Sequence, residues 1–169
     1  MNKFYLAHPL KMRFEIRARE LEFEKNTGIE LINPFYDPKG KSEEVEDTKS
    51  LDKAARTAWQ EGLPYETIVK NDIDTIERDD VGGTVVYVER TVHTIGTYME
   101  AWHTYSIGKR VFVVTPDWKD HPWLKFVAIK SGGEIFGSFK ELEEYMMRKL
   151  FVELTTMHRR EDYEVQSND

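Results

Sequence analysis

The chain of 169 residues contains no cysteine. Disulfide bonds, a thiolate nucleophile and zinc–thiolate sites are therefore excluded, and packing alone must stabilise the fold. Long apolar runs are also absent, since none approaches the roughly 20 residues that a membrane-spanning helix requires. The N-terminal segment has neither the long apolar core nor the small-residue cleavage site of a signal peptide. These absences predict a cytoplasmic protein that does not contact membranes.

Sequence motifs of several common enzyme classes are missing as well. There is no G-x-G-x-x-G loop, no Walker A lysine loop, no G-x-S-x-G elbow and no H-E-x-x-H pair, so dinucleotide, ATP, serine-hydrolase and zinc-protease chemistry lose support. The five histidines show no paired metal-ligand spacing. They are His8, His93, His103, His121 and His158. We therefore expect neither a metal nor a cofactor.

The overall composition is that of a globular protein, with 40% hydrophobic and 12% aromatic residues. A formal net charge of -7 at pH 7 argues against binding to a nucleic acid polymer, whose phosphates would be repelled. The length suits one domain with its own core. We predict a single domain over residues 1–158 and a polar C-terminal tail over residues 159–169.

Short apolar runs alternate with helical segments along the chain. The runs that end at Ala7, Ile32, Val88 and Val114 predict buried strands, and a weaker strand is expected over residues 134–136. This alternation predicts an α/β fold, with an open parallel sheet of about five strands and helices on both faces. Ligands of such sheets bind beyond the carboxyl ends of the strands, so the site is expected there.

The intervening segments are expected to be helices or loops. In the first helix Phe14, Ala18 and Leu21 recur at helical spacing, and Gly28 marks its end. Further helices are expected over residues 51–60, 65–78, 97–107 and 138–154. The almost wholly polar segment 37–52 predicts a long loop that could act as a lid.

The surroundings of Glu100 allow two interpretations. Thr97-x-x-Glu100 has the spacing of a capping box, in which the glutamate reaches back to the threonine amide. The same placement, however, puts the carboxylate in the first helical turn after a strand, where the helix dipole favours the ionised form. An ionised, positioned carboxylate can act as a nucleophile.

Asp72 is the second candidate. It shares a helical stripe with Tyr65, Val69 and Ile76, and a buried carboxylate is costly unless it is paired or functional. A position at the helix edge, facing solvent, is equally compatible with the spacing, while Asp80 before Gly82-Gly83 indicates a turn. Two carboxylates and a tyrosine near strand ends suit cleavage of a glycosidic bond, whose transition state is oxocarbenium-like.

Four segments then occur in order between about residues 3 and 115. They are Phe4-Tyr5-Leu6-Ala7, Asn33-Pro34-Phe35-Tyr36, Asn71-Asp72-Ile73 with Asp80, and Gly96-Thr97-x-x-Glu100 followed by Tyr105-Ser106-Ile107-Gly108-Lys109-Arg110-Val111. None is specific alone. As an ordered set, they resemble the nucleoside 2-deoxyribosyltransferase family and its relatives that hydrolyse nucleoside 5′-monophosphates.

The resemblance implies roles for individual residues. In that family the glutamate of the Gly-x-x-x-Glu segment attacks the anomeric carbon and forms a covalent glycosyl-enzyme, which makes Glu100 the nucleophile. Tyr5 would lie close to it, Asp72 would contact the base and help to protonate it, and Phe35 would flank the base. The resemblance also implies a flavodoxin-like sheet and a homo-oligomer, a dimer or larger, in which a neighbour completes the pocket through residues 117–123.

Three positions depart from the family pattern. Thr94 stands six residues before the nucleophile, where the transferases usually carry an aspartate and the monophosphate hydrolases a small hydroxyl residue. The asparagine that a neighbour supplies in the family is not evident near His121-Pro122-Trp123. His8 stands where relatives often have a small residue such as glycine, and it would narrow or polarise the base pocket.

The predicted activity is transfer of a sugar from a nucleoside or nucleotide to a free nucleobase. One alternative is an N-glycosidase that hydrolyses (deoxy)nucleoside 5′-monophosphates. Another is a nucleotide-binding module without turnover, because a fold does not dictate a function.

Thr94 favours binding of a phosphate. An aspartate there would repel it, whereas a threonine hydroxyl can donate to a phosphate oxygen beside the backbone amides of Gly96 and Thr97. Lys109 and Arg110 lie beyond the far end of the helix and are expected to be solvated.

Overall fold

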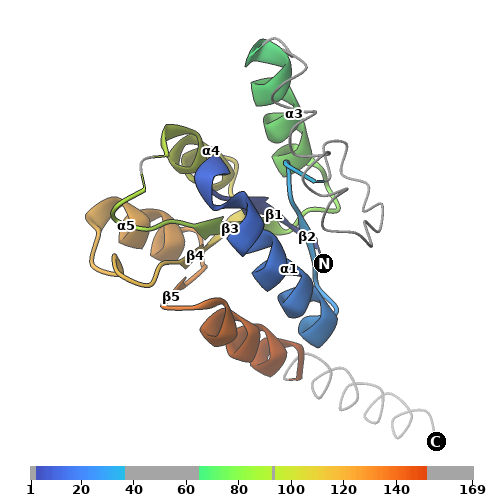
Figure 1. Ribbon diagram of the computed structural model, residues 1–169, viewed down its shortest axis with the longest axis vertical. Helices are drawn as coiled ribbons and strands as arrows, with labels where there is room; N and C mark the ends of the chain where they lie inside the picture. The colour runs from blue at the N-terminus through green and yellow to red at the C-terminus, as the bar shows by residue number, and fades with distance from the viewer. Residues whose placement is uncertain (1–2, 37–64, 93, 152–169) are drawn as a thin grey trace, which may run out of the picture.

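The computed structural model describes residues 3–36, 65–92 and 94–151. Within them, five strands form one parallel sheet in the order β2-β1-β3-β4-β5 (Figure 1). The strands are β1 (Lys3–Ala7), β2 (Glu30–Ile32), β3 (Gly83–Tyr87), β4 (Arg110–Val114) and β5 (Ile135–Phe136). The predicted α/β fold is confirmed, and the strand order is the flavodoxin-like one, with its switch point between β1 and β3.

Helices cover both faces of the sheet, as predicted. The helical elements are η1 (Leu10–Met12), α1 (Arg13–Thr27), α3 (Tyr65–Glu77), α4 (Ile95–Ser106) and α5 (Pro122–Lys130). A last helix begins at residue 139 and reaches the end of the described range at residue 151. Sequence reasoning missed α5, although Pro122 at its first position is a common helix start.

Alternate residues of each strand pack into two separate cores, because successive side chains point to opposite faces. Phe4 and Leu6 of β1 belong to the core beneath α1 and the last helix. Tyr5 and Ala7 belong to the core beneath α4 and α5. The parity of β1 therefore places Tyr5 on the same side of the sheet as α4.

The buried face of α1 differs from the predicted one. Phe14 and Leu21 are 49% and 42% exposed, and Ala18 is exposed as well. Ile16 and Phe23 contact the sheet instead, and the charged residues Arg17 and Glu20 are buried between them. The prediction failed because it treated all charged positions as solvent-facing, whereas these two side chains pair with each other. The predicted glycine stop is confirmed, since Gly28 adopts a φ of 69°.

Several predictions lie outside the described residues: the polar loop 37–52, the helix 51–60 and the tail 159–169. For the helix over residues 65–78 the prediction is confirmed, although Tyr65 and Val69 of its stripe are 75% and 57% exposed. No helix in the described part of the chain has the length and apolar character needed to cross a membrane.

Candidate active site

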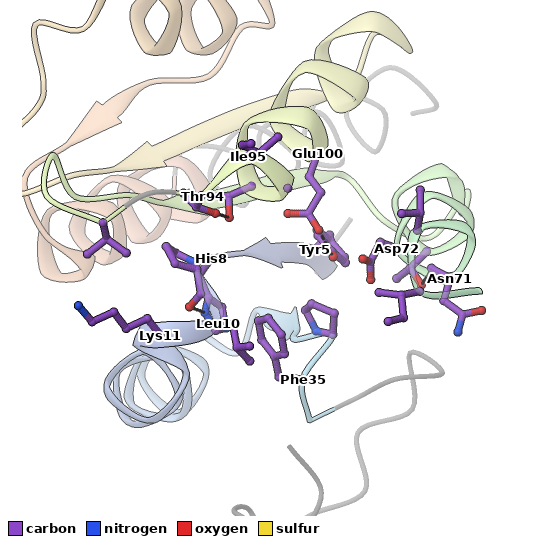
Figure 2. A pocket seen from close by; sticks show the side chains of 18 of the residues that line it. Tyr5, His8, Leu10, Lys11, Phe35, Asn71, Asp72, Thr94, Ile95 and Glu100 are labelled. Carbon is purple, nitrogen blue, oxygen red and sulfur yellow. Dashed lines mark hydrogen bonds between the residues drawn. The ribbon is translucent and has the colours of Figure 1, made fainter. Parts of the chain in front are cut away.

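A cavity of about 710 Å³ opens at the carboxyl ends of β1 and β2, with α3 beside it and the start of α4 above it in the view of Figure 2. All eight residues that the sequence analysis proposed as catalytic or substrate-binding line it. These residues are Tyr5, His8, Phe35, Asp72, Thr94, Gly96, Thr97 and Glu100. The strand-end rule therefore predicted the position of this cavity, although 95 positions separate Tyr5 from Glu100 in the sequence.

Tyr5 and Glu100 form the central contact of the cavity. The Tyr5 hydroxyl donates a hydrogen bond of 2.7 Å to Glu100 Oε1, and Figure 2 shows the two side chains meeting, with Asp72 beside them. Tyr5 is held rigidly, because its ring is buried in the core beneath α4. The main chain of Glu100 is fixed by Thr104, whose hydroxyl donates to the Glu100 carbonyl oxygen at 2.8 Å.

This contact contradicts the capping-box interpretation. The helix α4 begins at Ile95, two residues earlier than predicted, and Thr94 is its N-cap residue. Glu100 is therefore the sixth residue of the helix and lies in its second turn, where its side chain turns to Tyr5. The Thr94 hydroxyl lies 2.5 Å from the Thr97 hydroxyl instead.

The charge state predicted for Glu100 is also wrong. Burial and, to a smaller extent, the nearby Asp72 raise its pKa to about 8, against a lowering by the hydrogen bond from Tyr5. Beyond the first turn, the helix dipole is too distant to compensate. Burial likewise raises the pKa of Asp72 to about 6, against a lowering by Tyr5. The two carboxyls thus share about one proton near neutral pH, and their titration belongs to the pair.

His8 and Phe35 form an aromatic wall of the cavity. Their ring centroids are 4.8 Å apart at an interplanar angle of 56°. Burial lowers the pKa of His8 to about 4, so the imidazole is neutral at pH 7. The wall is an uncharged, partly apolar surface that suits a flat heteroaromatic ring.

The start of α4 supplies a polar edge to the same cavity. Thr94, Gly96 and Thr97 line it, and no side chain caps the first amides of the helix. Such an N-terminus attracts anions. Sequence reasoning missed Lys11, which lines the cavity from η1. Its position four residues after β1 was the available signal, because loops at the carboxyl ends of strands converge on the site.

Lys109 and Asp80, which the sequence analysis also considered, lie outside the cavity. Lys109 was predicted to be solvated, but its ammonium donates to the carbonyl oxygens of Ile76 and Arg78 at 2.7 and 2.6 Å. Its positive charge interacts favourably with the carbonyl oxygens at the end of α3, which is the negative end of the helix dipole. Asp80 is an exposed turn residue paired with Arg78, as predicted.

No protein-family model and no curated protein matches the chain. Solved structures do match. A 2-deoxyribosyltransferase from the psychrotolerant bacterium Bacillus psychrosaccharolyticus aligns with a TM-score of 0.52 and 13% identity, over 83% of this chain and 90% of that one. The CMP N-glycosidase BcmB of Clostridium botulinum aligns with a TM-score of 0.50 and 15% identity, over 87% of this chain and 98% of that one.

The chain has the fold of a 2-deoxyribosyltransferase. The resemblance drawn from the ordered segments is therefore confirmed at the level of the fold. Both structural neighbours are enzymes that process nucleosides or nucleotides.

The segment 117–123, expected to contribute to a neighbour's pocket, does not line the cavity of its own chain. Trp118, His121 and Trp123 surround a separate hollow of about 340 Å³ together with Tyr98 and Trp102. Among the residues that the structure describes, no group of three or more His, Cys, Asp or Glu side chains is arranged to hold a metal ion.

Proposed function

We propose that this cavity cleaves the N-glycosidic bond of a (deoxy)nucleoside or its 5′-monophosphate, with Glu100 as the nucleophile. The observation that carries the proposal is the Tyr5 to Glu100 hydrogen bond beside Asp72. It places a positioned carboxyl beside a second carboxyl that shares a proton with it, and cleavage of a glycosidic bond needs one carboxyl ionised and the other protonated. A cavity of about 710 Å³ is of the size that takes a nucleoside.

In the first step the Glu100 carboxylate attacks the anomeric carbon. The bond from that carbon to the base nitrogen breaks, and the base keeps the electron pair. In the reactive form of the pair the shared proton has passed from Glu100 to Asp72, and Asp72 gives it to the departing base. Tyr5 lowers the pKa of Glu100 and so favours the ionised nucleophile.

In the second step the covalent sugar ester is resolved. A second nucleobase attacks the anomeric carbon and gives up a proton to Asp72, which is transfer, or water does so, which is hydrolysis. Glu100 leaves as a carboxylate in both cases. The His8 and Phe35 rings flank the departing and incoming base.

The start of α4 favours phosphorylated substrates within this scheme. Thr94 brings a hydroxyl without a charge to the edge where Gly96 and Thr97 present their amides. A 5′-phosphate there gains hydrogen bonds from the helix N-terminus, and Lys11 adds a positive charge to the same cavity. The monophosphate N-glycosidase activity is therefore the second candidate.

The experiment is incubation of the purified protein with a panel of deoxynucleosides and their 5′-monophosphates, each with and without a second free base. Transfer yields a new nucleoside only when the second base is present, and hydrolysis yields free base and sugar without it. Intact-protein mass spectrometry of the quenched reaction should show the mass of one sugar added, and Glu100→Gln should lose that adduct. Binding without any product would support the module without turnover and contradict the proposal.

We further propose that a second copy of the chain covers an apolar surface on α4 and α5. Met99, Trp102, Trp123 and Phe126 are between 42% and 63% exposed, and the Trp102 ring contacts the rings of both Trp123 and Phe126. Ile95 continues this surface, is 81% exposed and also lines the cavity. A copy packed there reaches the cavity mouth, which makes the site depend on assembly.

The assembly is tested by sedimentation and activity of Met99→Glu. Met99→Glu is expected to lose both the oligomer and the release of base. Leu21→Glu on α1 is the matched control, because Leu21 is similarly exposed, at 42%, but lies on another helix. An oligomer unaffected by Met99→Glu contradicts the proposed interface.

A further inference from the structure

A chain of buried polar side chains runs behind the aromatic wall. Arg17 of α1 pairs with Glu20 Oε1, and the other Glu20 oxygen accepts a hydrogen bond of 2.6 Å from Asn33 Nδ2. Asn33 Oδ1 lies 3.2 Å from His8 Nε2. It also accepts the Phe35 backbone N–H at 3.1 Å. One oxygen atom therefore contacts both members of the wall.

The side-chain amide of Asn33 can adopt only one orientation here. Reversing it would place Oδ1 against the Glu20 carboxylate, and Nδ2 against the Phe35 N–H. Both contacts would be repulsive, because the first would set one acceptor against another and the second would set one donor against another. Asn33 and Glu20 are 0% exposed, so water cannot relieve either clash.

The fixed orientation decides the state of His8. Its ring is neutral at pH 7, because burial lowers its pKa to about 4, so only one ring nitrogen carries a hydrogen. Nδ1 lies 3.1 Å from the Pro9 carbonyl oxygen. Both this oxygen and Asn33 Oδ1 already accept one backbone N–H, from Met12 at 2.9 Å and from Phe35 at 3.1 Å. Asn33 Oδ1 is the stronger acceptor of the two, because the Glu20 carboxylate polarises the amide through Nδ2.

We propose that Asn33, held by Glu20 and Arg17, is a positioning residue that fixes His8 as its Nε2–H tautomer and sets the aromatic wall that receives the base. The ligand part of this statement rests on the proposed function. The tautomer does not, because it follows from hydrogen bonds within the chain.

The first test is made on the parent protein, and a variant is needed only to assign the His8 signal. In ¹⁵N-labelled protein at pH 7, two-bond ¹H–¹⁵N correlation spectra report which ring nitrogen of each histidine carries the hydrogen. The His8 signal is identified by its loss in His8→Ala. A hydrogen on Nε2 is expected. A hydrogen on Nδ1, or an equal mixture of both tautomers, overturns the proposal whatever the protein's activity.

The second test reverses the hydrogen bond between Asn33 and Glu20. Asn33→Asp sets two carboxylates against each other and is expected to raise KM about tenfold, the equivalent of one hydrogen bond of about 1.4 kcal/mol, while kcat changes little. Combining it with Glu20→Gln lets the new amide donate to the new carboxylate and leaves the net charge unchanged. The double variant is expected to lower KM most of the way back to the value of the parent protein.

The matched control is Glu15→Gln, which removes the exposed pair with Arg19 on the same helix and should leave KM unchanged. Equal KM values for Asn33→Asp and the double variant overturn the proposal, as does a loss confined to thermal stability. If Asn33→Asp does not fold, the His8 tautomer measured in the parent protein decides whether the proposal holds. If no substrate is cleaved at all, the proposed function fails while the tautomer still tests the role of Asn33.

Discussion

Glu100→Gln separates the chemistry of Glu100 from its packing. The substitution keeps the shape of the side chain but removes its charge. Burial holds the pKa of Glu100 at about 8 in the folded chain, compared with 4.5 ordinarily. The folded chain therefore keeps a proton that the unfolded chain loses, and its stability falls as the pH rises through the window from about 4.5 to 8. Glu100→Gln does not suffer this loss.

The magnitude follows from the shift in pKa. A rise from 4.5 to about 8 corresponds to roughly 5 kcal/mol at 1.36 kcal/mol per unit. Glu100 lines an open cavity, where water screens the charge, so about 2–3 kcal/mol is expected. Chemical denaturation of both proteins at pH 5 and pH 8.5 measures it. The variant should match the parent at pH 5, exceed it in stability at pH 8.5, and release no base at either pH.

Two results would refute this reasoning. Equal stability of the two proteins at pH 8.5 would mean that the Glu100 carboxylate is not destabilised by burial. Retention of most activity would mean that Glu100 is not the nucleophile, because loss of a nucleophile removes the covalent step itself.

Three further variants test the neighbours of Glu100. Asp72→Asn should slow cleavage most for substrates with poor leaving groups, because the proposed role of Asp72 is to protonate the base; equal slowing for good and poor leaving groups contradicts the acid role. Tyr5→Phe should lower kcat about 10- to 100-fold by removing a hydrogen bond to a carboxyl group. In the parent, kcat/KM against pH should be bell-shaped, with limbs near the values of about 6 and 8 of the carboxyl pair. Both limbs should move to higher pH in Tyr5→Phe, and an unmoved profile would show that Tyr5 does not tune the pair. Thr94→Asp should shift the ratio of cleavage efficiencies from the 5′-monophosphate towards the unphosphorylated nucleoside, and a ratio that stays the same contradicts a phosphate site at the start of α4.

The sequence by itself determined the class of fold and the edge of the sheet where the site lies. Short apolar runs such as residues 4–7 and 84–88 have the length and composition of buried strands, and their alternation with helices predicts parallel strands. Loops after parallel strands meet at one edge. The segments that follow Ala7, Ile32 and Val88 are therefore expected together, whereas the closeness of Tyr5 to Glu100 is what the family resemblance implies.

The tertiary structure decided what each of these groups contacts and in which state it exists. The sequence around Glu100 is compatible with a capping box and with a nucleophile, and the hydroxyl of Tyr5, brought from β1, argues against the capping box. Arg17 and Glu20 look like solvent-facing charges until their pairing allows α1 to bury them. Contacts between distant residues and the loss of water around a charge are properties of the packed chain. Local periodicity carries neither, because it reports only which side of an element a residue occupies.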